Sequence, residues 1–479
     1  MKQNLLDNKK YFYLFSSLIL LTIMFVITEV GLNLKIYSFF TPYKVTLLIA
    51  GLMFLIALLK NPKNTFFYSV DSVKNQLKET KVLIIFIAIY IIFDLISLVH
   101  TNNKSVALVK YVTIISMLAT IFLYILYLNK NSNSDKLNTL LVFLGTPAIV
   151  VSIYTWIYFF IHGYTYYARR LSLIQDYNKF SMLLFFSFIA VIYLIFRVVN
   201  SLNKRNLLLA ITTILCSSTI HLTASRRTSK MMNVVLILFC LYGIYDTYVK
   251  LKIKNNSKPS KKFLKKPLGK FFITVIITLI LSNFIIYTFN YVTTERVEKA
   301  TQSDDADSIP INRGVEDILE DSQALDKRST IWEIAIKSYK DYPLKNKIIG
   351  KGGSAHLDIY NQPENQEVLN KRVYWKVLPD NTVDPHNFLL VDLLNGGIFL
   401  VGVTLICMLT ILVLLFKIFR KSIVDAFFIF IFSISTLGDI FISSRNGMFD
   451  NKFIWIILIL IITVFNSLRH KNNLSKVIE

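Results

Sequence analysis

Cysteine is almost missing from this chain, with three residues in 479. Cys216, Cys240 and Cys407 all lie inside apolar runs, and they lack the spacing of a metal site or a disulfide framework. We therefore expect small core side chains at these positions. We expect neither a metal nor a cofactor.

Other signatures are missing as well. The sequence contains no Walker A pattern, no internal repeat and no sign of inverted halves. A Walker A loop would cradle nucleotide phosphates, so its absence argues against a nucleotide-driven pump.

Acidic residues are scarce, with 30 Asp and Glu against 53 Lys and Arg and a net charge of +23. In a soluble protein this balance would suggest nucleic acid. Most of the basic residues instead lie in short loops between apolar runs, where they set membrane topology. We expect no nucleic-acid partner.

Apolar residues are in excess, at 54% of the chain. They form runs of the length that crosses a bilayer as a helix, about 18–25 residues. Backbone groups in lipid must be hydrogen-bonded internally, so these runs predict helices. We expect an all-α integral membrane protein with about 12 transmembrane helices, at 12–29, 43–60, 82–99, 106–128, 137–161, 180–199, 207–222, 231–249, 271–291, 387–416, 424–443 and 453–467. The first run lacks an A-x-A-like cleavage site and is read as a retained helix.

The loops alternate in charge. Residues Lys250 to Lys270 hold nine lysines and no acid. If the N-terminus is inside, all the basic loops fall on the cytoplasmic face, as does the C-terminus. These loops are 250–270, 60–81, 200–206 and 417–422.

The segment 292–385 holds 17 acidic and 13 basic residues and is expected to be one large, partly helical extracytoplasmic loop. It separates 1–291, with nine spans, from 386–467, with three spans, and 468–479 is a cytoplasmic tail. Within it, 303–323 is expected to be mobile. The stretch 326–342 predicts an amphipathic helix, with Ile331, Ile334, Ala335 and Ser338 on one face.

Arginine pairs on the outer side of short loops oppose the positive-inside rule and need a reason. They are Arg169 with Arg170, and Arg226 with Arg227. Guanidinium is permanently charged and holds phosphate through two parallel hydrogen bonds, so an anionic ligand is one explanation. Anchoring to lipid headgroups is the other. We favour a ligand for the Ser225–Arg227 cluster, and both readings stay open for the first pair.

His386 lies where the polar loop re-enters the membrane. Pro385 suits a first helical turn, and Asp384 is a candidate cap. A neutral imidazole there can accept a proton from a hydroxyl, although a capping or interfacial histidine is the alternative. His221 is a candidate second polar contributor. Asp94 and Asp439 lie near outer span ends, where water can reach them.

Taken in order, these clusters resemble the O-antigen ligase and polymerase superfamily of bacterial membrane glycosyltransferases. The His-Asn pair and Leu/Gly-rich helix of that family read PHNFLLVDLLNGGIFLVG, residues 385–402. Its Arg, Trp and Gly-x-Gly stretch reads RSTIWEIAIKSYKDYPLKNKIIGKGG, residues 328–353. Ser225-Arg226 matches its Ser-Arg pair. Arg169 or Arg170, followed by Asp176-Tyr177-Asn178, matches a further motif in which Tyr177 replaces the usual proline.

The resemblance covers roughly 165–465 and implies a metal-independent glycosyltransferase of the GT-C type in the bacterial cytoplasmic (inner) membrane. The implied donor is an undecaprenyl-pyrophosphate-linked oligosaccharide at the outer leaflet, and an acceptor glycan and membrane lipids are further partners. Fixed arginines would stabilise the leaving pyrophosphate without a metal, and the acidic run 304–307 is not read as a metal site. The implied catalytic residues are His386, Arg226 and Arg328. The implied substrate-binding residues are Arg169, Arg170, Arg227, Asn178, Trp332 and Asn387.

Within that family, the leading interpretation is a polymerase of surface polysaccharide repeat units, such as O-antigen, capsule or exopolysaccharide. A chain-length regulator protein would be a natural partner of such an enzyme. The nearest alternative is a ligase that moves finished glycan onto lipid A core or another acceptor. A flippase for the same lipid-linked glycan is a third alternative, disfavoured because the polar groups gather at one face rather than the bilayer midplane.

Overall fold

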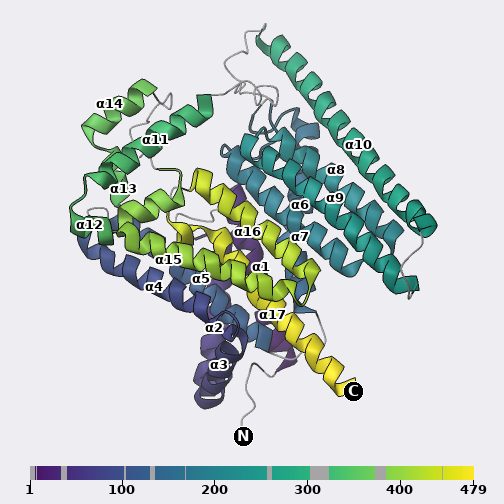
Figure 1. Ribbon diagram of the computed structural model, residues 1–479, viewed down its shortest axis with the longest axis horizontal. Coiled ribbons are helices and arrows are strands. Elements are labelled where there is room, and N and C mark those ends of the chain that lie inside the picture. The colour runs from purple at the N-terminus through teal and green to yellow at the C-terminus, as the bar shows by residue number, and fades with distance from the viewer. Residues whose placement is uncertain are drawn as a thin grey trace. The chain divides into compact units, whose positions relative to one another are not determined.

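The computed structural model describes residues 6, 8–33, 40–101, 104–129, 135–167, 169–255, 261–301, 323–372, 385–444 and 446–478. Among these residues the structure has helices and no β-strand, and Tyr167 and Arg170 form an isolated bridge. Eleven of the described helices are long and apolar enough to cross a membrane, or twelve if a bent pair counts as one span. The expected all-helical, multi-pass membrane protein is confirmed (Figure 1).

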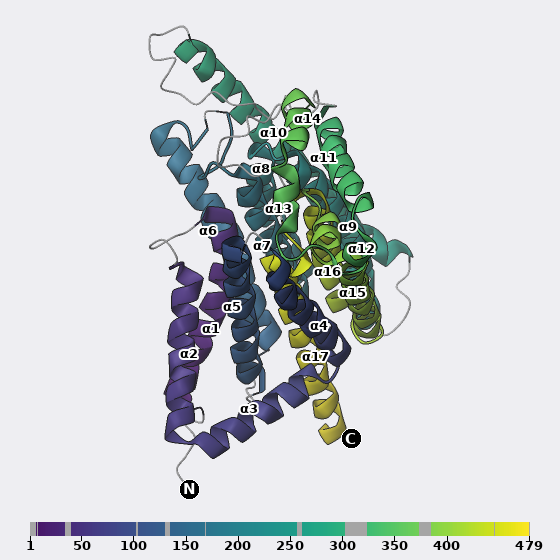
Figure 2. The ribbon, with the colours of Figure 1, turned by 90° about the vertical axis from the view of Figure 1, so that its left-hand side faces the viewer.

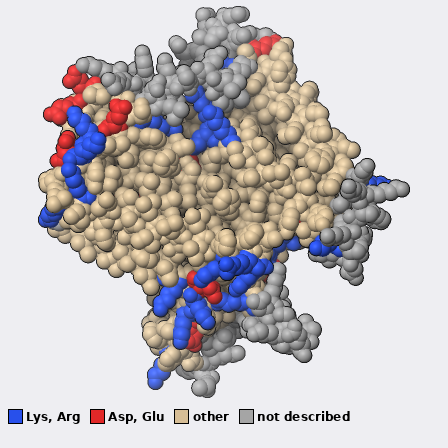
Figure 3. Space-filling model, in the orientation of Figure 1, with Lys and Arg blue, Asp and Glu red and all other residues tan. Residues whose placement is uncertain are grey.

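All twelve expected spans fall on helices, with ends that agree to within one residue or lie further out. In chain order these helices are α1 (Lys9–Leu32), α2 (Pro42–Lys60), α4 (Lys81–Ser97) with the 3-10 turn η2 (Leu98–His100), α5 (Lys104–Asn129), α6 (Lys136–His162), α7 (Tyr177–Val198), α8 (Leu202–Leu222), α9 (Arg226–Asn255), α10 (Lys261–Thr301), α15 (Phe388–Phe419), α16 (Ile423–Ser443) and α17 (Lys452–Ile478). Their outward faces carry exposed apolar side chains such as Ile115 and Phe284. Figure 3 shows wide uncharged stretches of surface in tan.

The chain divides into two compact units. Unit 1 comprises Met1–Thr22, Lys44–Leu137 and Asp321–Glu479, and unit 2 comprises Ile23–Tyr43 and Asn138–Glu320. Unit 1 therefore holds α2 to α5 and every helix from α11 onwards, and unit 2 holds α7 to α10 and nearly all of α6. In each unit, we call the end opposite its basic loops the predicted outer end.

The basic loop expected at 60–81 is instead a helix, α3 (Pro62–Leu77), bent by 106° against α4. Figure 2 shows it running crosswise between the ends of α2 and α4. Its buried face is polar, and the buried Gln76 accepts a hydrogen bond from Asn466 Nδ2 at 3.0 Å. Phe66 and Val70 are exposed. An apolar stripe beside a polar inner face is typical of a helix lying along a membrane surface.

The segment expected to be the outer loop, 292–385, is partly helical. Its first ten residues, 292–301, continue α10, because nothing in VTTERVEKAT breaks a helix. Most of the stretch expected to be mobile lies outside the described residues. The predicted amphipathic helix is confirmed as α11 (Gln323–Lys340), and α12 (Leu344–Ile349), α13 (Ala355–Tyr360) and α14 (Pro363–Arg372) follow it.

Helices α11, α13 and α14 share a small hydrophobic core. Ile331, Ile334 and Ala335 of α11 are buried against Tyr360, Leu369 and Leu394. Leu394 belongs to α15, so this core fastens the segment to the first turns of a membrane helix (Figure 1). Ser338 is only half buried at the edge of that face.

The orientation remains a prediction that single cysteines can test. In a background with Cys216, Cys240 and Cys407 changed to serine, Glu364→Cys should react with an impermeant thiol reagent on intact spheroplasts. Asn203→Cys should react only after the membrane is opened, because Asn203 lies in the basic loop 200–206, which is expected inside. Both positions are exposed, so labelling of opened membranes is the control. The reverse pattern would overturn the orientation.

Candidate functional site

The loop between α6 and α7 is folded at the predicted outer end of unit 2. Thr165 Oγ1 donates to the carbonyl oxygen of Arg170 at 2.6 Å, and the N–H of Leu171 donates to Leu222 O at 2.9 Å. The second bond ties the loop to the last residue of α8. The loop therefore holds Arg169 and Arg170 in fixed backbone positions.

The two arginines of this loop differ in environment. Arg170 is 5% exposed, and its guanidinium lies 4.1 Å from the ring centre of Tyr177, a cation–π distance. Arg169 is half buried and reaches Thr294 Oγ1 of α10 at 3.4 Å. Burial raises the pKa of Tyr167, which donates its hydroxyl to Gln175 O at 2.6 Å. Arg170 is thus stacked inside the loop, and Arg169 is the more accessible of the pair.

Ser225 and Asn178 are joined directly, although they lie 47 residues apart. Ser225 Oγ donates to Asn178 Oδ1 at 2.8 Å and lies 3.1 Å from Thr228 Oγ1. Ser181 Oγ is 2.8 Å from the same Thr228 hydroxyl and donates to Asn178 O. This network fastens the start of α7 to the start of α9.

A tight turn places Arg226 and Arg227 in the first turn of α9. Ala224 has a left-handed φ of 55°, which reverses the chain between α8 and α9 within three residues. Both arginines are half buried. Cations at a helix N-terminus oppose the helix dipole, so this placement is unfavourable without a compensating anion.

His221 is fixed by two neighbours and joins α8 to α9. Its Nδ1 lies 2.8 Å from Ser217 O, and its Nε2 lies 3.1 Å from Asn233 Oδ1. With both ring nitrogens facing oxygens, the histidine serves as a structural link between helices.

In unit 1, the start of α15 meets α11. The indole Nε1 of Trp332 donates to the carbonyl oxygen of Pro385 at 2.9 Å. His386, half buried, follows with a left-handed φ of 50°. A non-glycine residue in that region is uncommon, and such strain clusters at functional sites. Arg328 is half buried on α11, one turn before Trp332.

Asn387, and not Asp384, caps α15. Its Oδ1 accepts hydrogen bonds from the N–H groups of Leu389 at 2.9 Å and Leu390 at 3.3 Å. The cap expectation was wrong because the helix begins at Phe388, which is out of reach of a side chain four residues earlier. Pro385 precedes the cap, outside the helix, and Asp384 lies outside the described residues. Asn387 is buried, and its side-chain oxygen caps the helix.

α15 is broken near its start, at Gly397. This glycine has φ 64° and ψ −164° inside an otherwise continuous helix. The N–H groups of Lys351 and Gly352 donate to Leu394 O at 3.2 Å and Asn395 O at 2.9 Å. The loop after α12 thus satisfies carbonyls that the break removes from the helical ladder. The two long motifs of the sequence, 328–353 and 385–402, therefore meet here. We call this contact, between residues 350–352 and 394–397, the seam.

A buried histidine also lies beside the contact between these motifs, at a position whose sequence context was a weaker signal than that of His386. His356 is 1% exposed, and its Nδ1 lies 3.1 Å from Asn395 Oδ1. Asn395-Gly396-Gly397 inside an apolar span was the available signal, since amides and paired glycines are unusual in a lipid-facing helix.

A buried polar network also lies at the predicted outer end of unit 1. Asp392, 1% exposed, accepts hydrogen bonds from Tyr90 at 2.7 Å and Thr404 at 2.8 Å. Asp94 accepts one from Tyr111 at 2.8 Å. Asp439 accepts one from Ser443 at 3.2 Å. Asp94 is half buried and Asp439 is buried, and both carboxylates are hydrogen-bonded within unit 1.

Asp450 lies in the short turn between α16 and α17. Its carboxylate accepts from Gly447 N at 3.1 Å and lies 4.0 Å from Lys110 Nζ. Burial raises the pKa of Asp450, and Lys110 and the Gly447 N–H oppose that rise. The carboxylates of this end are thus partnered within unit 1, and they link α4, α5 and α15.

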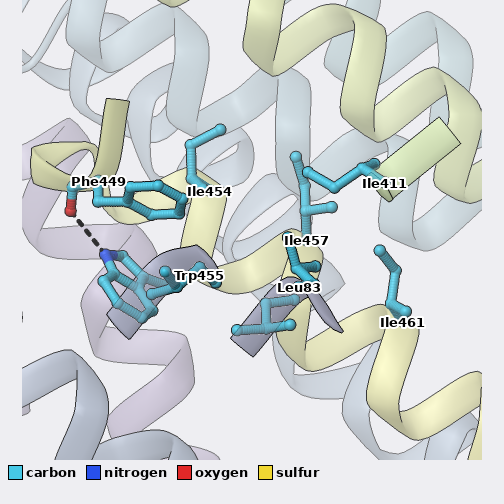
Figure 4. A pocket seen from close by; sticks show the side chains of 9 residues that line it. Leu83, Ile411, Phe449, Ile454, Trp455, Ile457 and Ile461 are labelled. Carbon is cyan, nitrogen blue, oxygen red and sulfur yellow. Dashed lines mark hydrogen bonds between the residues drawn. The ribbon is translucent and has the colours of Figure 1, made fainter. Parts of the chain in front are cut away.

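No group of three or more metal-ligating side chains comes together among the described residues. The acidic run 304–307 lies outside them. One small cavity in unit 1, shown in Figure 4, is lined by apolar residues around Trp455, whose indole donates to Phe449 O. With an apolar lining, it offers no group for chemistry.

The candidate residues thus fall into two sets. Unit 1 carries Arg328, Trp332, His386 and Asn387, and unit 2 carries Arg169, Arg170, Asn178, Arg226 and Arg227. Comparison of the chain with protein-family models finds no match, and comparison with curated proteins finds no relative.

Proposed function

We propose that this protein transfers a glycan from a polyprenyl-pyrophosphate carrier to an acceptor sugar, and that it polymerises surface polysaccharide repeat units. The observation that supports the proposal best is the entrance of α15. There a strained His386 is held between the cap residue Asn387 and the carbonyl that Trp332 binds. These residues come from the two motifs on which the family resemblance rests.

The arginines would act on the donor. Arg226 and Arg227 lie in the first turn of α9, and Arg169 lies in the loop that is bonded to the last residue of α8. Together they suit a pyrophosphate with several negative charges. Guanidinium groups fixed before the reaction stabilise charge as it develops on the leaving group. Arg328 of unit 1 is assigned the same role by the family resemblance.

His386 would act on the acceptor. The acceptor hydroxyl oxygen attacks the anomeric carbon, and the bond from that carbon to the pyrophosphate oxygen breaks. The hydroxyl proton passes to the neutral imidazole, and the polyprenyl pyrophosphate leaves with the bonding electrons. A histidine held in one backbone conformation can position its ring for this transfer.

Deletion in the host, followed by gel analysis of surface glycan, tests the reaction class. Accumulation of a single lipid-linked repeat unit is expected for a polymerase. Long chains retained on the carrier would identify the ligase alternative. A carrier glycan trapped on the cytoplasmic side would instead identify a flippase and overturn the transferase.

Complementation of that strain tests the arginines. Arg226→Ala is expected to abolish polymer formation while the protein stays in the membrane, because the pyrophosphate loses a bidentate partner. Arg226→Lys should restore only part of the activity, since an ammonium lacks the planar fork. Arg420→Ala is the matched control. Arg420 is an exposed arginine that follows the C-terminus of α15, at the end of this helix away from His386. Full polymer from Arg226→Ala would remove the anion site from the proposal.

A further inference from the structure

A cleft opens inside unit 2, among α7, α8, α9 and α10. Its position along α8, from Asn206 to Thr213, is in the half of the helix nearer the Lys-rich loop. The cleft therefore lies away from the arginine end of this unit. Its lining consists of Ile192, Phe196, Asn206, Leu209, Ala210, Thr213, Leu236, Phe239, Cys240, Phe271, Thr274, Val275, Thr278 and Leu279.

The walls of this cleft suit a hydrocarbon chain. Aliphatic and aromatic side chains dominate the lining, as is usual for sites that hold apolar ligands. Phe271 of α10 packs against Gly243 of α9, where an added Cβ would lie 2.4 Å from the ring. This contact joins the two helices at the Lys-rich end, and Leu236 and Val275 line the cleft nearer the middle of the spans.

Asn206 is one of four polar side chains in the lining, with Thr213, Thr274 and Thr278. Its side chain is 7% exposed, and its Oδ1 has no hydrogen-bond partner among the described residues. A buried acceptor without a donor is unfavourable in a low-dielectric setting. A bare acyl chain would leave that oxygen unsatisfied, so the cleft suits a ligand that brings a hydroxyl or amine donor.

Charge at the Lys-rich end of the cleft points to an anion. Lys266 and Lys270 are exposed one turn apart on α10, and Thr274, one turn further along, lines the cleft. The segment from Lys250 to Lys270 contains no acidic residue to offset them. Basic residues beside a membrane helix attract anionic headgroups.

We propose that this cleft binds an anionic glycerophospholipid whose headgroup carries a hydroxyl, of the phosphatidylglycerol class. An acyl chain fills the cleft, a headgroup hydroxyl donates to Asn206 Oδ1, and the phosphate lies near Lys266 and Lys270. This assignment does not depend on the proposed glycan transfer.

Cys240 reports occupancy of the cleft. It lines the cleft and is half buried, whereas Cys216 and Cys407 are buried elsewhere. In purified full-length protein, alkylation of Cys240 by N-ethylmaleimide is followed by mass spectrometry. At free phosphatidylglycerol of about ten times its Kd, the rate should fall about tenfold. Phosphatidylcholine and phosphatidic acid with the same chains should protect less, since neither has a headgroup hydroxyl beside an anionic phosphodiester.

Two variants distinguish the contribution of the lipid headgroup to binding from that of the acyl chain. Asn206→Leu should remove the preference for phosphatidylglycerol over phosphatidic acid. Leu209→Trp should fill the cleft and remove protection by either lipid. Leu207→Trp is the matched control, since Leu207 is 61% exposed on the same helix and lies outside the cleft.

Slow alkylation of Cys216 in every variant shows that unit 2 remains folded. Equal protection by all three lipids would overturn the proposed headgroup, and so would stronger protection by a polyprenyl phosphate. Full protection in Leu209→Trp would overturn the cleft as the binding site.

Discussion

His386→Ala is expected to lower the rate of glycan transfer by about 10²–10⁴-fold, the usual contribution of general acid–base catalysis. Binding of the lipid-linked donor should persist, because the arginines that are proposed to hold the pyrophosphate remain. Turnover and donor binding are measured separately, on purified protein with radiolabelled donor. His162→Ala is the matched control, because His162 is an exposed histidine at the predicted outer end of unit 2.

His386→Gln separates proton transfer from positioning. Glutamine can hydrogen-bond to an acceptor hydroxyl, but it cannot take its proton at neutral pH. We expect His386→Gln to be nearly as slow as His386→Ala across pH 5.5–8. Wild-type rates from the glutamine variant would show that His386 only orients the acceptor. Loss of donor binding in His386→Ala would move the residue to the pyrophosphate site.

The second large effect is expected at the break of α15. Gly397→Ala places a Cβ 2.4 Å from Ile348 O, and it does so at a φ of 64° that L-residues rarely adopt. Backbone strain of about 1–3 kcal/mol adds to a clash with main-chain atoms that cannot rotate away. We expect little folded protein after extraction, measured as the monodisperse fraction on size exclusion and as a lowered Tm.

Gly402→Ala is the control for this change. It lies five residues further along the same helix, and an added Cβ there meets nothing within 4 Å. Its stability should stay close to that of the wild type. Gly350→Ala should repeat the Gly397 effect from the other side of the seam, since its Cβ would lie 2.1 Å from Asn395 O. Normal stability of both variants would show that the seam is not required.

The membrane spans were predictable because the hydropathy of each apolar run depends only on the residues within that run. Helix α11 was predictable for a similar reason, since Ile331, Ile334 and Ala335 recur at helical spacing. Helix α3 was not, because its buried face is polar: Gln76 is matched to Asn466, 390 residues away. From sequence alone, a helix with a polar buried face is predicted as a loop, because the distant residues that it packs against are not known.

The candidate site divides in the same way. The arginine pairs were found because charge on the outer side of short loops breaks a local rule. The bond from Ser225 to Asn178, the Tyr90–Asp392 contact and the seam between Gly350 and Gly397 each need two distant segments. The prediction of the α15 cap was wrong although it involved only neighbouring residues, because the helix starts at Phe388, later than Pro385 suggests.

The broken helix also constrains the order in which the chain can fold during synthesis. The N–H groups of Lys351 and Gly352 find their acceptors on Leu394 and Asn395, which leave the ribosome 43 residues later. At typical synthesis rates that interval lasts about 2–9 seconds. Helices α11 to α14 must therefore wait, incompletely docked, until the start of α15 is made. A pause or truncation before residue 395 would leave this segment without its attachment to the membrane helix.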